Sequence, residues 1–342
     1  MTTIAVAVAG PTSRDRARAL RGRLRPGGGR PLANAPIGTV PILWNNVDVE
    51  ELRLGTDAAT LLDEFERLGY DGCQLGLGFP EGAELREALA ARDLRLAEVY
   101  AALPVSVDGP APDALDSGLE RLRLLTAGGG EVLCVAIDGT PERRAAAGQV
   151  GAPGGRPGSP AAPQLSDDGW RGLATVLHDL ARATLDAGAR IAFHPHAGTF
   201  VETPAETERL MTETDPELVP LCLDVGHWLV GGGDPVAALQ RYGERVTHLH
   251  LKDVDPTVLE RLRNGELDGF DEAIRERMFT ELGAGLLDLD GCLAVLAERD
   301  YRGWLMVEQD SGWPPPSESA AIGRRVLAAA LGRLPHSSEE RR

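Results

Sequence analysis

Short apolar runs alternate with helical patterns along most of the chain. Runs of this length, rich in Val, Leu, Ile and Ala, indicate strands that are buried on both faces. A first strand is predicted to begin near Ala35 and Gly38. Seven more are predicted at residues 72–77, 94–103, 132–137, 190–194, 219–223, 247–253 and 304–308.

Between these strands, apolar residues recur at helical spacing and capping residues mark the helix starts. Thr56 is predicted to cap a helix that closes at Gly69. Thr203, Pro204 and Glu206 have the spacing of a capping box with proline at the first helical position. Further helices are predicted at residues 83–92, 114–126, 167–187, 235–242 and 290–298.

This alternation predicts a single (β/α)8 TIM barrel over residues 34–334, since eight strand and helix units fit in about 300 residues. A doubly wound sheet is the alternative, but no GxGxxG follows the first strand. Residues 1–33 lack periodicity and are expected to be a disordered leader, with a disordered tail at 335–342. The Gly- and Pro-rich residues 138–163 are expected to form a long loop.

Composition excludes several classes of protein. The net charge of −17 argues against a nucleic-acid partner, which would need a basic face. No apolar run is long enough for a membrane span. Four cysteines without a CxxC motif indicate reduced thiols and a cytoplasmic protein: Cys73, Cys134, Cys222 and Cys292. The oligomeric state stays open, with a homo-oligomer allowed.

The predicted strand at 247–253 has an unusual polar face. His248, His250 and Lys252 share one parity, whereas Leu249 and Leu251 share the other. Lys252 is the only lysine, because the other 34 of the 35 basic residues are arginines. A lysine kept where arginine is otherwise used indicates a need for a compact ammonium that can release its proton. The alternative is a surface lysine retained by chance.

Polar residues stand at the carboxyl ends of four successive predicted strands. In a barrel these ends meet at one mouth, where catalytic residues cluster. Imidazoles and carboxylates together predict a divalent-metal site for Mn, Co, Zn, Fe or Mg. Taken singly, each could instead be a core histidine, a helix cap or a rim salt-bridge partner. The residues are His194, His196, Asp224, His227, His250 and Glu308.

Trp44 and Asn45 follow the first predicted strand. They are expected to form part of a substrate pocket by stacking and hydrogen bonding; the alternative is that they play no part in it.

Several motifs together resemble one family of barrels. They are the segment 35–38 with Trp44-Asn45-Asn46, HxHxGT at 194–199, DxGH at 224–227, HxHxKD at 248–253, the 278–285 segment, and Gly303-Trp304 leading to Glu308. On these motifs, residues 34–330 resemble the xylose-isomerase-like sugar isomerase/epimerase barrels, and within them most closely the inosose dehydratases. Gln74 departs from the family pattern, which tends to have an acidic residue there.

The resemblance implies a metal, preferably manganese or cobalt, held by His194, Asp224, His250 and Glu308. It implies a substrate such as 2-keto-myo-inositol, from which an α-proton and a β-hydroxyl leave as water. In related isomerases the first ligand is a glutamate that shuttles protons; histidine at that place favours a lyase. A metal-dependent sugar isomerase or epimerase is the alternative, and a non-catalytic barrel that binds polyols is a third reading.

Catalytic roles are expected for four residues of this mouth. Glu308 or a nearby imidazole would remove the α-proton. Lys252, His196 and His227 compete as the acid that protonates the departing hydroxyl. His196 and Lys252 are also expected to bind substrate, and Asp253 to orient His250 or Lys252.

Overall fold

The computed structural model describes residue 32 and residues 35–150, 162–310, 312 and 315–334. The predicted tail at 335–342 and nearly all of the predicted leader lie outside these residues. Among the described residues, no helix has the length and apolar character needed to cross a membrane.

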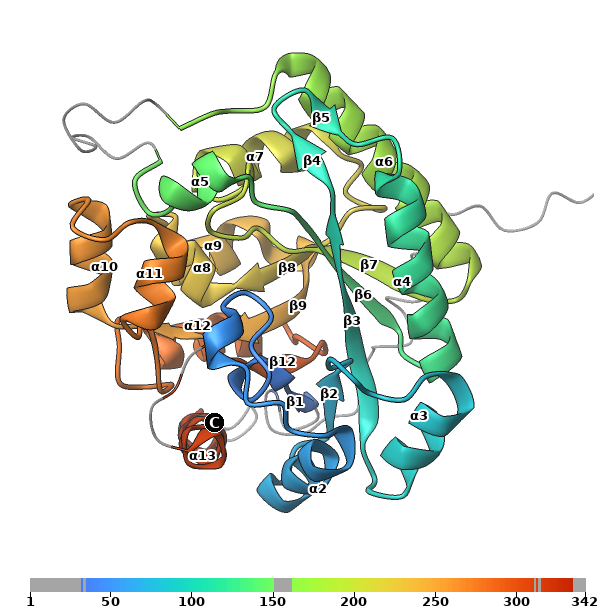
Figure 1. Cartoon of the computed structure of the whole chain (residues 1–342). Coiled ribbons are helices and arrows are strands. Elements are labelled where there is room, and N and C mark those ends of the chain that lie inside the picture. The colour runs from blue at the N-terminus through green and yellow to red at the C-terminus, as the bar shows by residue number, and fades with distance from the viewer. Residues whose placement is uncertain (1–31, 33–34, 151–161, 311, 313–314, 335–342) are drawn as a thin grey trace, which may run out of the picture.

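Eight parallel strands close into a barrel, as the strand and helix alternation predicts (Figure 1). Around the barrel the hydrogen-bonded order is β1-β12-β9-β8-β7-β6-β3-β2. The strands are β1 (Ile37–Thr39), β2 (Gly72–Gln74), β3 (Arg95–Leu103), β6 (Val132–Ile137), β7 (Arg190–Phe193), β8 (Leu221–Asp224), β9 (Val246–Leu251) and β12 (Leu305–Val307).

An outer ring of helices covers the barrel (Figure 1). One principal helix follows each barrel strand. These helices are α2 (Ala58–Leu68), α3 (Gly82–Ala90), α4 (Ala114–Gly128), α6 (Asp167–Asp186), α7 (Pro204–Glu213), α9 (Pro235–Tyr242), α12 (Leu289–Glu298) and α13 (Pro316–Arg333).

Local chemistry explains most helix boundaries. Thr203 and Glu206 form the predicted capping box at the start of α7. Gly69 ends α2 in the left-handed conformation at φ 74°, as a C-terminal glycine is expected to do. The predicted cap at Thr56 is wrong by one residue: the Asp57 side chain accepts the N–H of Thr60 instead. Asp and Thr both cap well, so sequence alone could not choose between these neighbours.

Additional short helices and strands lie within the loops. Within the segment predicted to be only loop, α5 spans Pro141–Ala145. The loop after β9 carries elements that sequence analysis did not predict, and α13 was also missed. The remaining α-helices and strands of the described residues are α8 (Val225–Val230), α10 (Pro256–Arg263), α11 (Phe270–Arg275), the ribbon β10–β11 (Asp253–Val254 and Phe279–Thr280) and the ribbon β4–β5 (Val105–Ser106 and Gly109–Pro110), and three 3-10 helices span Pro41–Leu43, Glu50–Leu52 and Gly243–Arg245.

The two faces of β9 differ as the alternation predicts. Leu249 and Leu251 are fully buried in the main apolar core. His248 and His250 both contact Glu98 of β3. Strands β9 and β3 lie on opposite sides of the barrel, separated by other strands in both directions, so these contacts cross its interior. The barrel therefore holds a polar cluster in its centre.

Candidate metal centre and active site

Four side chains converge at the carboxyl ends of β7, β8, β9 and β12. They are His194, Asp224, His250 and Glu308, and one ligand atom from each lies within 4.8 Å of the others. The structure thus brings together the four residues that the sequence singled out from segments far apart in the chain.

The donor atoms of this group lie close to one another, but three of them make no hydrogen bond with a described residue. Asp224 Oδ2 lies 3.6 Å from His194 Nε2 and 3.8 Å from His250 Nδ1, which in turn lies 2.6 Å from Glu308 Oε2. Asp224 Oδ2, His250 Nδ1 and Glu308 Oε2 are buried, and none is in hydrogen-bonding geometry with a described residue. Buried polar atoms usually have partners, so a mixed nitrogen and oxygen set of this kind fits a divalent cation.

Asp224 is oriented by the helix that follows it. Its Oδ1 accepts the backbone N–H of His227 at 2.8 Å and so caps α8. That bond holds the carboxylate in place at the end of β8 and leaves Oδ2 for the convergent group. One side chain therefore serves both the helix start and the site.

His250 is oriented from inside the barrel by Glu98, which sequence analysis missed. Glu98 Oε2 lies 3.0 Å from His250 Nε2 and 2.6 Å from His248 Nε2. Burial alone would raise the pKa of Glu98, but the two imidazoles lower it below its usual value. An ionised carboxylate retains the ring proton on Nε2, which leaves the Nδ1 lone pair free for a cation. The only carboxylate in the apolar strand β3 was the available sequence signal.

Lys252 occupies a cage of carboxylates just beyond β9. Its Nζ lies 2.7 Å from Asp310, 3.0 Å from Glu308 and 3.4 Å from Asp224. Burial opposes the charge, but these three groups hold the pKa of Lys252 well above its usual value. Lys252 is therefore an ammonium ion. Asp310, two residues after Glu308, was missed because nothing in its local sequence marks it.

The rings of His196 and His227 lie against each other, with centroids 3.7 Å apart and a tilt of 34° between their planes. His196 Nδ1 lies 2.7 Å from the carbonyl oxygen of Ala197, which can only accept, so Nδ1 carries the ring proton. Burial lowers the pKa of His196 to about 3 and that of His227 well below its usual value. His196 is therefore neutral, with a lone pair on Nε2.

A cavity of about 290 Å³ opens beside the convergent group. It is large enough for a six-carbon ring with its hydroxyls. Polar and apolar residues share its wall: Val40, Ile42, Val47, Asp48, Gln74, Tyr100, Ala102, Ile137, Asp138, Gly139, Arg144, His194, His196, Thr199, His250, Glu308 and Asp310.

Trp44 and Asn45, which were expected to contact the substrate, make their contacts elsewhere in the protein. Trp44 is buried in the main core, edge-to-face on Phe65. Asn45 exchanges two hydrogen bonds with the backbone of Thr56. Neither lines the cavity beside the convergent group, but Asn45 lines a neighbouring cavity, so its role in binding substrate stays a prediction. The two cavities share Ile42, Val47, Gln74 and Tyr100.

Asp253 does not orient His250 or Lys252 as expected. Its carboxylate accepts backbone N–H groups from Gly283, Gly285 and Leu287 and so fixes the loop after β11. At Gly285 a Cβ atom would lie against this carboxylate and the Val254 carbonyl, so the loop needs glycine there.

Comparisons with known proteins agree with the barrel fold. Residues 62–330 match the model of the xylose isomerase-like TIM barrel family. Inosose dehydratase 1 of a Bacillus cereus strain is 30% identical over 299 residues, covering 86% of this chain and 97% of the relative. An inosose dehydratase of Clostridium botulinum is 31% identical over 296 residues, covering 85% and 95%.

A solved structure has the same fold. The IOLI protein with a bound zinc atom superposes with a TM-score of 0.62 and 15% identity, covering 88% of this chain and 99% of that one.

Proposed function

This chain belongs to the xylose isomerase-like TIM barrel family and is a hydro-lyase, and we propose that it dehydrates a cyclic polyol ketone with the help of a divalent cation. The substrate proposed is 2-keto-myo-inositol or a close analogue, from the name of the relatives. The observation that carries the proposal is the convergence of four donor atoms, three of them without a hydrogen bond to any described residue, beside a cavity that fits one ring.

His194, Asp224, His250 and Glu308 would hold the cation. When bound, it would supply Lewis acidity toward the ketone oxygen and a neighbouring hydroxyl of the substrate, and stabilise the enolate that forms after loss of the α-proton. Manganese or cobalt suits this nitrogen and oxygen set, and zinc is present in the IOLI structure.

His196 is the proposed acceptor of the α-proton. It lines the cavity, it is neutral, and its Nε2 carries a lone pair because Nδ1 donates to Ala197. The ring cannot rotate easily, since His227 lies against it and Phe270 packs against its edge at 5.4 Å. His227 is thus proposed as a positioning residue.

Lys252 is the proposed source of the proton that leaves with the β-hydroxyl. Its ammonium donates to Glu308 Oε1 at 3.0 Å, and Glu308 lines the cavity. A proton can therefore pass from Nζ along this hydrogen bond toward the departing oxygen. Hydroxide is a poor leaving group, so the elimination needs this donor as well as an acceptor for the α-proton.

The decisive experiment separates elimination from isomerisation. Metal-stripped protein reloaded with Mn²⁺ or Co²⁺ is incubated with 2-keto-myo-inositol in deuterated water, and product mass and ultraviolet absorbance are followed. Loss of one water with a new enolic-dione absorbance is expected. Deuterium uptake at unchanged formula would instead assign the protein to the isomerases and epimerases.

Variants test the proton donor. Lys252→Met keeps the length of the side chain and removes its protons, so kcat is expected to fall about 10²–10⁴-fold. Binding of Mn²⁺, measured separately, shows whether the site itself survives. The control is Arg302→Met, because Arg302 pairs with Asp300 at the surface outside the cavity. Unchanged kcat in Lys252→Met would remove Lys252 from the mechanism.

A further inference from the structure

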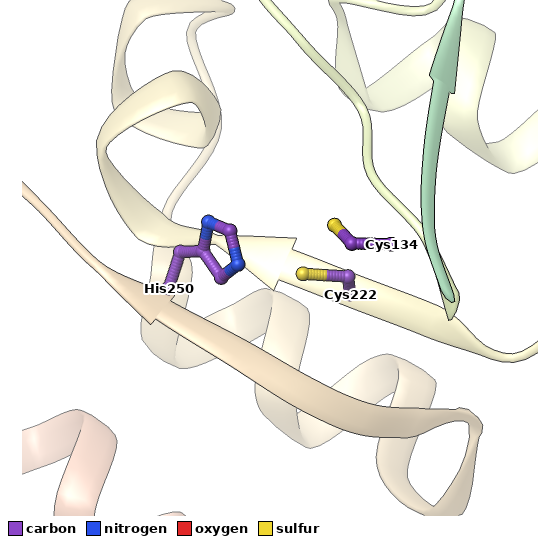
Figure 2. Close-up of side chains that lie close together, drawn as sticks. All are labelled: Cys134, Cys222 and His250. Atoms are coloured by element: carbon purple, nitrogen blue, oxygen red, sulfur yellow. The ribbon is translucent and has the colours of Figure 1, made fainter. Parts of the chain in front are cut away.

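A second group of donor atoms lies inside the barrel, on the far side of the His250 ring from Glu308. Cys134 comes from β6 and Cys222 from β8, and their sulfur atoms and one His250 nitrogen lie within 4.8 Å of one another. Figure 2 shows both sulfurs on the side of the ring nitrogen farther from Cβ, which is Nε2. His250 Nδ1 lies on the other side, beside Glu308.

We propose that Cys134, Cys222 and His250 Nε2 form an inner binding site for a thiophilic divalent ion such as Zn²⁺ or Cd²⁺. Two thiolates and an imidazole are the donors that soft and borderline ions prefer, whereas the outer set of carboxylates and imidazoles also suits harder ions. Binding would release the two thiol protons to solvent, so that the two thiolates balance the charge of the ion.

Unpartnered polar atoms in the same layer support a cation there. Glu98 Oε1 and His248 Nδ1 are buried and make no hydrogen bond with any described residue. Glu98, His248 and His250 form a further convergent donor group, which shares the His250 imidazole with the two cysteines and places a carboxylate oxygen 3.0 Å from its Nε2. Glu98 adds negative charge in an interior where isolated charge is costly, and this further favours a cation.

The inner and outer sites compete for one imidazole. A neutral ring carries one proton, and an ion on Nε2 forces that proton onto Nδ1. Nδ1 then has no lone pair for the outer set, which loses His250 as a ligand. Occupation of the inner site is therefore expected to weaken the outer site, and thiophilic ions should inhibit through a position that substrate does not touch.

The test reads metal binding through sulfur and does not depend on turnover. Full-length, metal-stripped protein is titrated with Cd²⁺ under reducing conditions, and the sulfur-to-cadmium charge-transfer absorbance is recorded. One equivalent is expected to saturate the band. Cys134→Ala and Cys222→Ala should each lose most of it. Cys292→Ala should keep it, because Cys292 is a buried free thiol in α12, outside the barrel.

Serine variants at positions 134 and 222 distinguish loss of the sulfur ligands from loss of the fold, because serine has nearly the same volume as cysteine. Circular dichroism checks that these variants fold. A band that persists in Cys134→Ser/Cys222→Ser, or no band in the folded wild type, would overturn the inner site.

Displacement of Mn²⁺, followed by electron paramagnetic resonance, tests the competition. Displacement of half of the Mn²⁺ should need about tenfold less Cd²⁺ in the wild type than in Cys134→Ser/Cys222→Ser. Loss of a residue that supports a metal ligand typically weakens metal binding about 10–100-fold, and the expected ratio is the low end of that range. Equal concentrations would exclude coupling through His250. Failure of the dehydratase assay with a positive cadmium band would leave the inner site intact and reject only the proposed reaction.

Discussion

The two halves of the barrel mouth differ in the residues that they present to the cavity. The strands β7, β8, β9 and β12 bring the imidazoles and carboxylates of the convergent group. The opposite half, from β1, β2, β3 and β6 and the loops that follow them, contributes the apolar residues Val40, Ile42, Val47, Tyr100, Ala102 and Ile137, together with the polar residues Asp48, Gln74, Asp138 and Arg144. The first half, called the polar half below, carries the groups that can bind a cation and move protons, and the second, called the apolar half, supplies most of the apolar wall.

The polar half is costly to build, and partners inside the protein offset that cost. Charged groups in a poorly hydrated interior are tolerated only where opposite charges or hydrogen bonds compensate them. Lys252 lies among three carboxylates, and Glu98 lies between two imidazoles. In the apolar half the charged wall residues Asp48 and Arg144 lie 3.7 Å apart and compensate each other. Changes in the polar half should therefore have large effects on chemistry, and changes in the apolar half should have small effects on binding.

The largest effect is expected for Asp224→Asn. Asparagine keeps the Oδ1 acceptor that caps α8, while an NH₂ group replaces Oδ2, the oxygen that faces the convergent group. Loss of this donor should remove several kcal/mol of transition-state stabilisation, roughly a 10³-fold fall in kcat/KM. Metal content and steady-state kinetics measure it. Asp234→Asn is the matched control, because Asp234 caps α9 outside the cavity. Full activity in Asp224→Asn would contradict a metal role.

Glu202, in the loop after β7, should make the free energy of unfolding depend on pH. Burial raises the pKa of Glu202 from 4.5 to about 7, although Gly148 and Gly198 donate to it. The folded state therefore binds more protons than the unfolded state between these values, and the free energy of unfolding falls as pH rises through them. The cost approaches about 3 kcal/mol above pH 7.

Urea unfolding of wild type and Glu202→Gln at several pH values isolates this contribution. The wild type should lose stability relative to the variant between pH 4.5 and 7. A difference that does not change with pH would show that the carboxyl titrates normally.

A smaller effect is expected for Glu98→Gln. Glutamine keeps the size but removes the charge that fixes the Nε2 proton of His250. Loss of such a partner typically weakens metal binding about 10–100-fold. Calorimetric titration with Mn²⁺ measures it. Glu98→Asp, which keeps the charge on a shorter side chain, should recover part of the affinity. If both variants bind metal equally weakly, Glu98 acts through packing alone.

The smallest effect is expected in the apolar half, for Tyr100→Phe. This change removes one hydroxyl from the cavity wall and keeps the ring that packs edge-on against His194 at 5.9 Å. A single neutral hydrogen bond to substrate is worth about 0.5–1.5 kcal/mol, so KM should rise by up to about tenfold at nearly constant kcat. A large fall in kcat would give this half of the mouth a chemical role and break the contrast between the halves.

Periodicity and capping residues in the sequence are sufficient to predict the eight-stranded barrel. Strands 132–137 and 190–194 and the capping box at Thr203 are local patterns, so they could be predicted from sequence. The convergent group was predictable for a related reason: in a barrel, strand ends meet at one mouth, so residues at successive strand ends must become neighbours. Helices α10, α11 and α13 were missed: α10 and α11 are short insertions within one long loop, and the apolar face of α13 is weakly marked.

Only the tertiary structure decided which polar residues have partners. Glu98 lies 152 positions before His250 in sequence, and nothing local shows that the two side chains meet across the barrel. Asp253 stands beside Lys252 in sequence, yet its carboxylate binds a loop about thirty residues further on. Trp44 lies next to the mouth in the chain but packs into the core. Sequence patterns report the face and the end of an element, whereas hydrogen-bond partners depend on contacts between distant elements that only the closed barrel creates.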